Sequence, residues 1–156
     1  MKSLGEKDVS GKEQDKGTYI LLTKLAKTQK INPGKLPETD YKKGTYLYVG
    51  RARTGLRARI RRHIKKQKKL FWHIDYLLQK AKIVEIWIRQ DYFAECHTAD
   101  KIRDFKPTAA KAIQGFGSSD CRCLSHLFYF PPDTRGLKSL KTKIRFEKVK
   151  IDGNNF

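Results

Sequence analysis

The sequence contains no apolar run near the roughly 18 residues that a membrane-spanning helix requires. Its first residues also lack the apolar core of a signal peptide. The three cysteines are an odd number, and Cys121 and Cys123 are too close in sequence to bridge easily. We therefore expect no disulfide framework, no membrane partner and a reducing, cytoplasmic location, and the secreted and membrane-spanning classes are excluded.

Acidic side chains are also scarce. The 156 residues include 16 Asp and Glu against 35 Lys and Arg, a formal net charge of +19. Residues 1–16 are polar with balanced charges, and we expect a disordered tail there. Of the excess charge, +10 falls between Arg51 and Lys69 and +6 between Arg135 and Lys150. A solvated helix face is the ordinary explanation of such runs, but this concentration favours a polyanionic partner such as nucleic acid.

Hydrophobic patterning predicts one α+β domain with the element order β–β–α–α–β–α–β. Apolar, β-branched and aromatic runs predict four strands, at Thr18–Thr23, Thr45–Val49, Lys82–Ile88 and Leu124–Phe130. The basic end, Leu137–Ile151, is compatible with a helix followed by a strand, because Lys143–Ile151 alternates. Apolar residues at helical spacing predict helices from Leu56, over Phe71–Ala81 and over Tyr92–Asp104. The first two predicted strands share a Gly-Thr-Tyr sequence, so we expect them to pair through a long hairpin, with loop over Pro37–Gly44.

Two pairs of residues have chemistry suited to a phosphate group. Tyr19 and Tyr48 lie on neighbouring predicted strands, and Gly50 at a strand end permits close approach of the backbone. Arg59 and His63 are four residues apart and share one side of a predicted helix. Arginine can hold two phosphate oxygens, and histidine can hold water or a phosphate. The alternatives are core tyrosines and a structural histidine.

Glu95 is an acid on a predicted inward helix face that it shares with Ala99 and Ile102. An unpaired carboxylate is costly there, so we expect a neighbouring cation. That cation is either an arginine or a divalent metal ion, and a metal ion suits phosphodiester chemistry. The turn Gly115–Asp120 either offers backbone N–H groups to an anion or is an ordinary loop.

Three cysteines and one histidine suggest a structural Zn²⁺ site formed by Cys96, Cys121, Cys123 and His126. The Cys-x-Cys-x-x-His spacing is tighter than in most structural zinc sites, so this is the less favoured interpretation. The sequence contains no phosphate-binding P-loop, no Ser-His-Asp order and no dinucleotide-binding fingerprint.

The residues singled out above also match a known pattern. Gly17-Thr18-Tyr19 and Leu47-Tyr48-Val49-Gly50 resemble the paired signatures of the GIY-YIG nuclease superfamily. The similarity continues through Arg51-Ala52-Arg53, Leu56, Arg59 and His63 to Glu95. The closer resemblance is to the Uri-type endonuclease branch, which occurs alone or fused to endonuclease III. The stretches that resemble this branch are Gly44–Gly50, Trp72–Leu77, Glu95-Cys96, Gly115–Cys121 and Ser125–Tyr129.

This resemblance implies a nuclease domain over residues 17–130, built on a central three-stranded antiparallel sheet flanked by helices. Residues 131–156 would be a basic C-terminal extension packed on or following that domain. The implied activity is that of an endonuclease that hydrolyses DNA phosphodiester bonds with one Mg²⁺ or Mn²⁺ ion. Structured or damaged DNA, in repair or recombination, is the expected substrate. The alternative is a non-catalytic module that binds DNA or RNA, and a protein partner or a dimer is left open.

The resemblance also implies a role for each matching residue. Glu95 would hold the metal ion, Arg59 would steady the scissile phosphate, and His63 belongs to the catalytic set. Tyr19 and Tyr48 would orient or deprotonate the attacking water, with the base left open between them. The residues expected to hold the DNA backbone are Arg51, Arg53, Arg57, Arg61, Arg62, Lys65 and Lys66. An asparagine found in many family members is not recognisable, and Ser119 or Asp120 would take its place.

Overall fold

The computed structural model describes residues 15–105 and 111–150. The strands are β1 (Gly17–Leu25), β2 (Gln29–Ile31), β3 (Thr39–Tyr41), β4 (Gly44–Ala52), β5 (Lys82–Arg89), β6 (Lys111–Ala112), β7 (Leu127–Phe130) and β8 (Glu147–Val149). The helices are α2 (Leu56–Ile64), α3 (His73–Leu78), the 3₁₀ turn η1 (Tyr92–Ala94), α4 (Glu95–Asp104) and α5 (Leu137–Lys143). Six strands form one antiparallel sheet in the order β6-β7-β4-β1-β5-β8, and β2 pairs with β3.

The sheet is built around the pairing of β1 with β4. These nine-residue strands run antiparallel in one unbroken register, from Gly17 opposite Ala52 to Leu25 opposite Gly44. Successive side chains of a strand point to opposite faces, so each strand supplies two separate cores. Almost every residue of both strands is buried, as expected for central strands covered on both sides.

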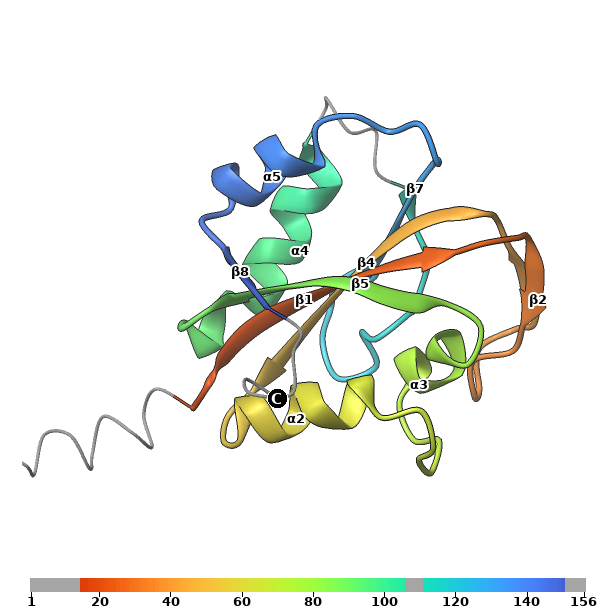
Figure 1. The fold of residues 1–156 in the computed structure, drawn as a ribbon, viewed down its shortest axis with the longest axis horizontal. Helices are drawn as coiled ribbons and strands as arrows, with labels where there is room; N and C mark the ends of the chain where they lie inside the picture. Colours follow the sequence, from red (N-terminus) through yellow and green to blue (C-terminus); the bar gives the residue numbers. More distant parts are fainter. Residues whose placement is uncertain (1–14, 106–110, 151–156) are drawn as a thin grey trace, which may run out of the picture.

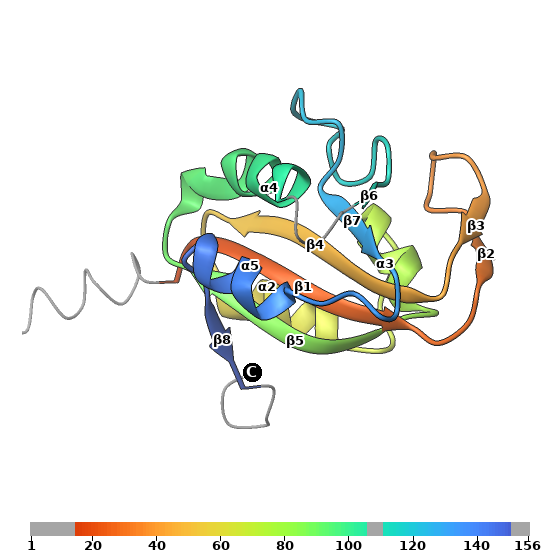
Figure 2. The ribbon, with the colours of Figure 1, turned by 90° about the horizontal axis from the view of Figure 1, so that it is seen from above.

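Helices cover both faces of the sheet. Figures 1 and 2 show α4 and α5 on one face and α2 and α3 on the other. The core beneath α2 and α3 contains Tyr19, Tyr48 and Ile60, and the core beneath α4 and α5 contains Trp87 and Ile102. In the part of the chain that the structure describes, no helix is long and apolar enough to cross a membrane.

The predicted α+β class and the pairing of the first two strands are confirmed. The expected central three-stranded sheet is not confirmed, and the observed sheet has six strands. Beyond β1, β4 and β5, the strands β7 and β8 lie within the segments predicted as strands at Leu124–Phe130 and Lys143–Ile151. β6 was not predicted, because two residues are too few to produce an alternation in the sequence. The loop expected over Pro37–Gly44 is also partly wrong, since it contains β3, whose partner β2 is equally short.

The basic C-terminal segment contributes to the same sheet. α5 buries Leu140, and the turn that follows buries Ile144 and Phe146 in the core shared with α4. β8 then pairs with β5 at the edge of the sheet. Within residues 131–150 the chain therefore completes one face of the domain, and residues 151–156 lie outside the described residues.

The start of α2 depends on a residue from the segment expected to be a tail. The Asp15 carbonyl accepts a hydrogen bond from the N–H of Leu56 (3.0 Å), and its carboxylate accepts one from the N–H of Arg57 (3.1 Å). These contacts satisfy N–H groups in the first turn of α2, which have no partner within the helix. The rest of the predicted tail, residues 1–14, lies outside the described residues.

Candidate active site

Two tyrosines from adjacent strands lie side by side at one end of the sheet. Tyr19 on β1 and Tyr48 on β4 have ring centroids 6.4 Å apart. Gly50 stands opposite Tyr19 in the β1–β4 register, and a Cβ at that position would lie 2.5 Å from the tyrosine ring and hydroxyl. Glycine is therefore required at Gly50 to make room for the Tyr19 ring, a reason that differs from the phosphate approach expected from the sequence.

His63 on α2 supports Tyr19 from below. Its Nε2 lies 2.7 Å from the Tyr19 hydroxyl, and the imidazole is only 2% exposed. Burial, together with the positive charges of Lys68, Arg62 and Arg59, lowers the pKa of His63 to about 3 against the opposing charge of Asp75. His63 is therefore neutral at physiological pH and can accept the Tyr19 proton at Nε2. Burial also raises the pKa of both tyrosines well above the ordinary value, so both hydroxyls are protonated.

The buried neutral state of His63 predicts a pH-dependent stability. The unfolded chain binds a proton at His63 below pH 6.5, whereas the folded chain does not until about pH 3. Stability is therefore lost as pH falls, by about 2 kcal/mol between pH 7 and pH 5. We expect His63→Gln to lose about 2 kcal/mol less than wild type over this interval, measured by urea unfolding at both pH values. His97→Gln, at an exposed histidine, should retain the wild-type slope, and equal slopes for all three proteins would contradict the argument.

Arg59 is held across the mouth of the site by two contacts. Its Nη1 donates to the carbonyl of Arg51 (2.9 Å), and its guanidinium lies over the Trp72 ring, 4.8 Å from the centroid. Trp72 is stacked on a second guanidinium, that of Arg62, at 4.4 Å. These contacts fix Arg59 without neutralising its charge, so an anion can still bind it.

The guanidinium of Arg62 binds groups of the protein itself. It forms a two-pronged ion pair with Asp75, at 2.8 and 2.9 Å, and donates to the carbonyl of Lys69. Asp75 is fully buried and also accepts the N–H groups of Phe71 and Trp72, both at 2.9 Å. Burial alone would raise the pKa of Asp75, but these hydrogen bonds hold it below its ordinary value. This pair fixes the turn that presents Trp72 to the site.

Glu95, at the first turn of α4, lies between two nitrogen groups. Its Oε2 is 2.9 Å from Nε of Arg51, and its Oε1 is 3.0 Å from Nδ1 of His126. The His126 N–H does not point straight at the oxygen, so the second contact is close but not a linear hydrogen bond. The arginine that the sequence left as one alternative is thus present, and the carboxylate keeps 14% of its surface exposed.

These side chains meet in one pocket of about 420 Å³. Of the residues proposed from the sequence, Tyr19, Tyr48, Arg51, Arg53, Arg59 and Glu95 line it, together with Ser119 and Asp120. His63 does not line the pocket, but it contacts the pocket residue Tyr19 through the Tyr19 hydroxyl. The remaining basic residues do not line it, namely Arg57, Arg61, Arg62, Lys65 and Lys66.

Several pocket residues were not identified from the sequence as site residues. Phe71, Trp72, His73 and Tyr92 line the pocket, and Arg51 and Arg53 lie over the Tyr92 ring at 5.0 and 5.6 Å. His73 accepts a hydrogen bond at Nδ1 from the N–H of Gly117, which binds the glycine-rich loop to α3. The available signal was the aromatic pair Phe71-Trp72 at the start of the second predicted helix, but its separation from Arg59 in the chain concealed the contact.

Two parts of this site could hold a metal ion. Among the described residues, one cluster of metal-ligating side chains has a Cys₃His composition, with Cys96, Cys121, Cys123 and His126 offering ligand atoms within 4.8 Å of one another. Glu95 is a single carboxylate open to the pocket, with free lone pairs on both oxygens. A hydrated Mg²⁺ or Mn²⁺ ion needs only one or two carboxylates when a substrate phosphate completes its shell, so the donor set at Glu95 fits such an ion.

Comparison with known proteins places the chain in a family. The family model described as a domain of unknown function, DUF123, matches residues 18–148. The chain belongs to the DUF123 family. No curated protein and no solved structure matches it. The matched DUF123 segment runs from β1 to β8 and contains every pocket residue named above, so the pocket belongs to the family domain.

Proposed function

We propose that this protein is a metal-dependent endonuclease that hydrolyses DNA phosphodiester bonds. The observation that carries the proposal is the convergence of Tyr19, Tyr48, Arg59 and Glu95 on one pocket from four different elements. Two hydroxyls, one guanidinium and one carboxylate are the groups needed to position water, bind a phosphate and hold a divalent ion. The resemblance to the Uri-type branch of GIY-YIG nucleases supports the same assignment for each of these residues.

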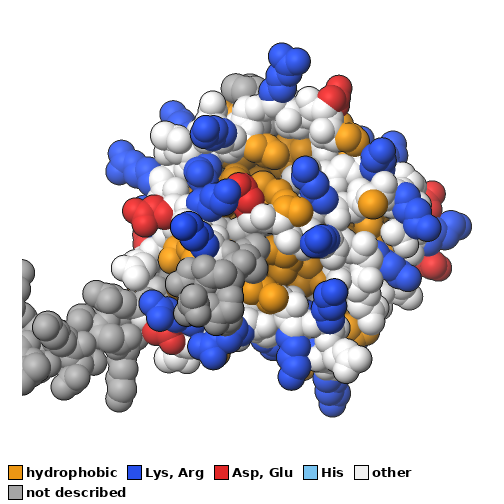
Figure 3. Space-filling model, viewed as in Figure 1, with side chains coloured by type: hydrophobic (Ala, Val, Ile, Leu, Met, Phe, Trp, Pro, Cys, Tyr) orange, Lys and Arg blue, Asp and Glu red, His pale blue; other side chains and the backbone are white. Residues whose placement is uncertain are grey.

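The electrostatics of the pocket favour an anionic substrate. Three arginines line it, Arg51, Arg53 and Arg59, whereas Glu95 and Asp120 are its acidic residues. On the face seen in Figure 3, Lys and Arg side chains also far outnumber acidic ones. Phosphate contacts of this kind supply most of the sequence-independent affinity for DNA.

Aromatic side chains beside the pocket favour nucleic acid over a small phosphate. Phe71 is 74% exposed and lines the pocket, and Phe93, 82% exposed, is in ring contact with the pocket residue Tyr92. Exposed aromatic rings next to arginines provide stacking surfaces for unpaired bases. Structured or damaged DNA, which presents such bases, is therefore the proposed substrate, with a role in repair or recombination.

Arg59 and Glu95 would take separate roles towards a bound phosphate. Arg59 would bind a non-bridging phosphate oxygen, and Glu95 would hold Mg²⁺ or Mn²⁺. When bound, such an ion neutralises charge on the phosphate and lowers the pKa of water.

The hydrogen bond between Tyr19 and His63 favours Tyr19 as the group that accepts a proton from water. As the water proton reaches the Tyr19 oxygen, the hydroxyl proton can move to Nε2 of His63. An anionic phosphate in the pocket would raise the pKa of His63 and so favour this transfer. The Tyr48 hydroxyl has no protein hydrogen-bond partner within the described residues, so it lacks such a relay.

The proposal is tested with a panel of duplex, flap, bubble and four-way DNA substrates. We expect cleavage with Mg²⁺ or Mn²⁺ on at least one branched or mismatched substrate, and no cleavage with Ca²⁺ or without added metal. Omitting the ion is preferable to adding a strong chelator, which could also act on the Cys₃His cluster. Salt-sensitive binding without cleavage of any substrate would instead indicate a non-catalytic nucleic-acid-binding module.

A further inference from the structure

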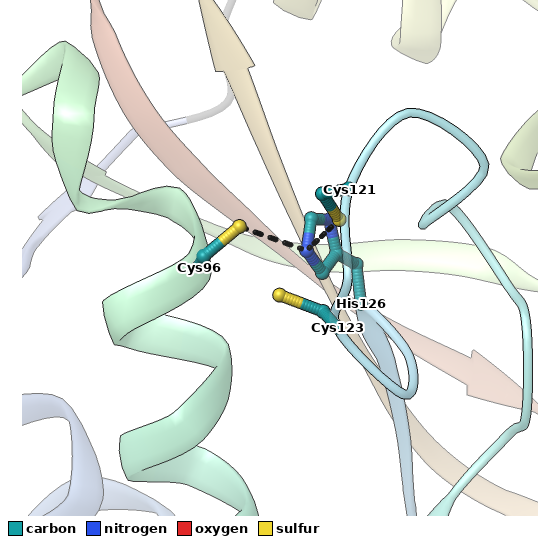
Figure 4. Close-up of side chains that lie close together, drawn as sticks. All are labelled: Cys96, Cys121, Cys123 and His126. Atoms are coloured by element: carbon teal, nitrogen blue, oxygen red, sulfur yellow. Dashed lines mark hydrogen bonds between the residues drawn. The ribbon is translucent and has the colours of Figure 1, made fainter.

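Four potential metal ligands come together behind the glycine-rich loop (Figure 4). Cys96 projects from the first turn of α4, whereas Cys121, Cys123 and His126 come from the segment that leads into β7. All three cysteines are free, although their sulfurs lie within 4.8 Å of one another and of a histidine nitrogen. The cluster joins two segments that are 25 or more residues apart in the chain.

The two sulfur-to-nitrogen distances that His126 makes, to Cys96 and Cys121, agree with tetrahedral coordination. With Zn–S bonds of about 2.3 Å and Zn–N bonds of about 2.05 Å, a sulfur lies about 3.6 Å from the nitrogen and about 3.8 Å from another sulfur. The observed distances from Nε2 of His126 are 3.6 Å to Sγ of Cys121 and 3.8 Å to Sγ of Cys96. A thiol sulfur is only a weak hydrogen-bond donor, so two sulfurs converging on one nitrogen are poorly explained by hydrogen bonding alone.

The orientation of the His126 ring also favours metal binding. Nδ1 faces the Glu95 carboxylate at 3.0 Å, and Nε2 faces the sulfurs of Cys96 and Cys121 at 3.8 and 3.6 Å. With its proton on Nδ1, a neutral imidazole would present the Nε2 lone pair to the cysteines. A carboxylate behind the second nitrogen is the usual partner of a zinc-bound histidine. The backbone of His126 is also fixed, because its N–H donates to Phe116 and its carbonyl accepts from Val49, both at 2.8 Å.

We propose that Cys96, Cys121, Cys123 and His126 bind one structural Zn²⁺ ion. Three thiolates and one imidazole fill a tetrahedral shell and leave no open position, which is typical of structural rather than catalytic zinc. Mg²⁺ and Ca²⁺ prefer oxygen ligands, so this site is chemically distinct from the one at Glu95.

The zinc ion would fix the loop that carries part of the pocket. Residues Gly115–Asp120 form turns rather than a helix or strand, yet Gly117, Ser119 and Asp120 line the pocket. A bond between this loop and α4 would hold these residues in place, and His126 would orient the Glu95 carboxylate. The zinc proposal does not depend on the nuclease proposal, because a binding module would need the same loop.

The test is the metal content of the full chain, purified with a reductant from zinc-replete cells. We expect close to one zinc ion per chain, and after replacement by Co²⁺ a thiolate-to-cobalt absorption with tetrahedral d–d bands. Cys123→Ser should lose both signals. The matched control His97→Gln, next to Cys96 but exposed, should retain them.

A second variant keeps the result interpretable if Cys123→Ser fails to fold. Cys123→His restores a four-ligand set, so it should bind Co²⁺ with a spectrum shifted by the loss of one thiolate. Wild-type protein that contains no zinc, binds no Co²⁺ and shows three freely titrating thiols would overturn the proposal. Because these measurements use no DNA, that outcome would leave the nuclease proposal standing.

Discussion

Glu95→Gln is expected to reduce DNA cleavage by roughly 10³-fold or more, because the several kcal/mol that a bound metal ion contributes correspond to about tenfold per 1.4 kcal/mol. Glutamine preserves the size of the side chain and one oxygen, but it removes the charge that would hold the ion. DNA affinity should stay equal or increase slightly, since one negative charge leaves a pocket lined by three arginines. The measurements are the single-turnover cleavage rate in Mg²⁺ and the DNA dissociation constant in Ca²⁺.

The control for this variant is Asp100→Asn on the same helix. Asp100 is half exposed, pairs with Arg103 and does not line the pocket, so the same change of charge should leave cleavage within about twofold. Zinc content must also be compared, because Glu95 contacts His126. Cleavage by Glu95→Gln at the wild-type rate, with normal zinc content, would rule out Glu95 as the metal ligand of the reaction.

The regular elements of this fold could be predicted where local patterns are strong. β1 and β4 are long runs of apolar and aromatic residues, and both were predicted within two to three residues of their ends. β8 lies within Lys143–Ile151, whose alternation predicts a strand, whereas β6 has only two residues and its pairing depends on β7 beside it rather than on its own sequence. Among the strands of this sheet, only the edge strand β6 was therefore not predicted from the sequence.

The candidate site was predictable to the extent that single residue types have distinctive chemistry. Tyr19, Tyr48, Arg59 and Glu95 were identified in this way, and all four line the pocket. Contacts that depend on tertiary packing could not be foreseen from spacing, because residues far apart in the chain must first be brought together. The approach of Cys96 to the other members of the Cys₃His cluster belongs to this class.

Arg62 shows a different limit of the sequence pattern. It lies within a run of ten basic residues, and nothing in that run distinguishes it from Arg57 or Arg61. In the structure it pairs with the fully buried Asp75, whereas its two neighbours are exposed. The distinguishing feature is thus a single acid 13 residues away, whose partner is determined by the packing of α2 against α3.

Asp75→Asn is expected to destabilise the fold by about 3 kcal/mol, because it removes the charge of a buried ion pair and leaves at least one donor facing another donor. The Asp75 carboxylate accepts four hydrogen bonds, two from Arg62 and one each from the N–H groups of Phe71 and Trp72. The side-chain amide of asparagine has only one oxygen that can accept these hydrogen bonds. Arg62 retains partial exposure, with 29% of its side chain accessible, which keeps the loss near the lower end for a buried pair. For a chain of this size the melting temperature should fall by roughly 6–12 °C.

The pH dependence of this loss separates the ion pair from simple packing. The folded-state pKa of Asp75 lies below its ordinary value of 3.8, so its contribution is present above that pH and is lost as pH falls through the folded value. The difference in stability between wild type and Asp75→Asn should therefore be constant from pH 7 to pH 5 and shrink below pH 4, as measured by urea unfolding. Asp100→Asn, which breaks an exposed pair, should change stability by less than about 0.5 kcal/mol throughout. A loss for Asp75→Asn that is equally small would show that Arg62 is solvated rather than bound to Asp75, and would return Arg62 to the set of residues available to DNA.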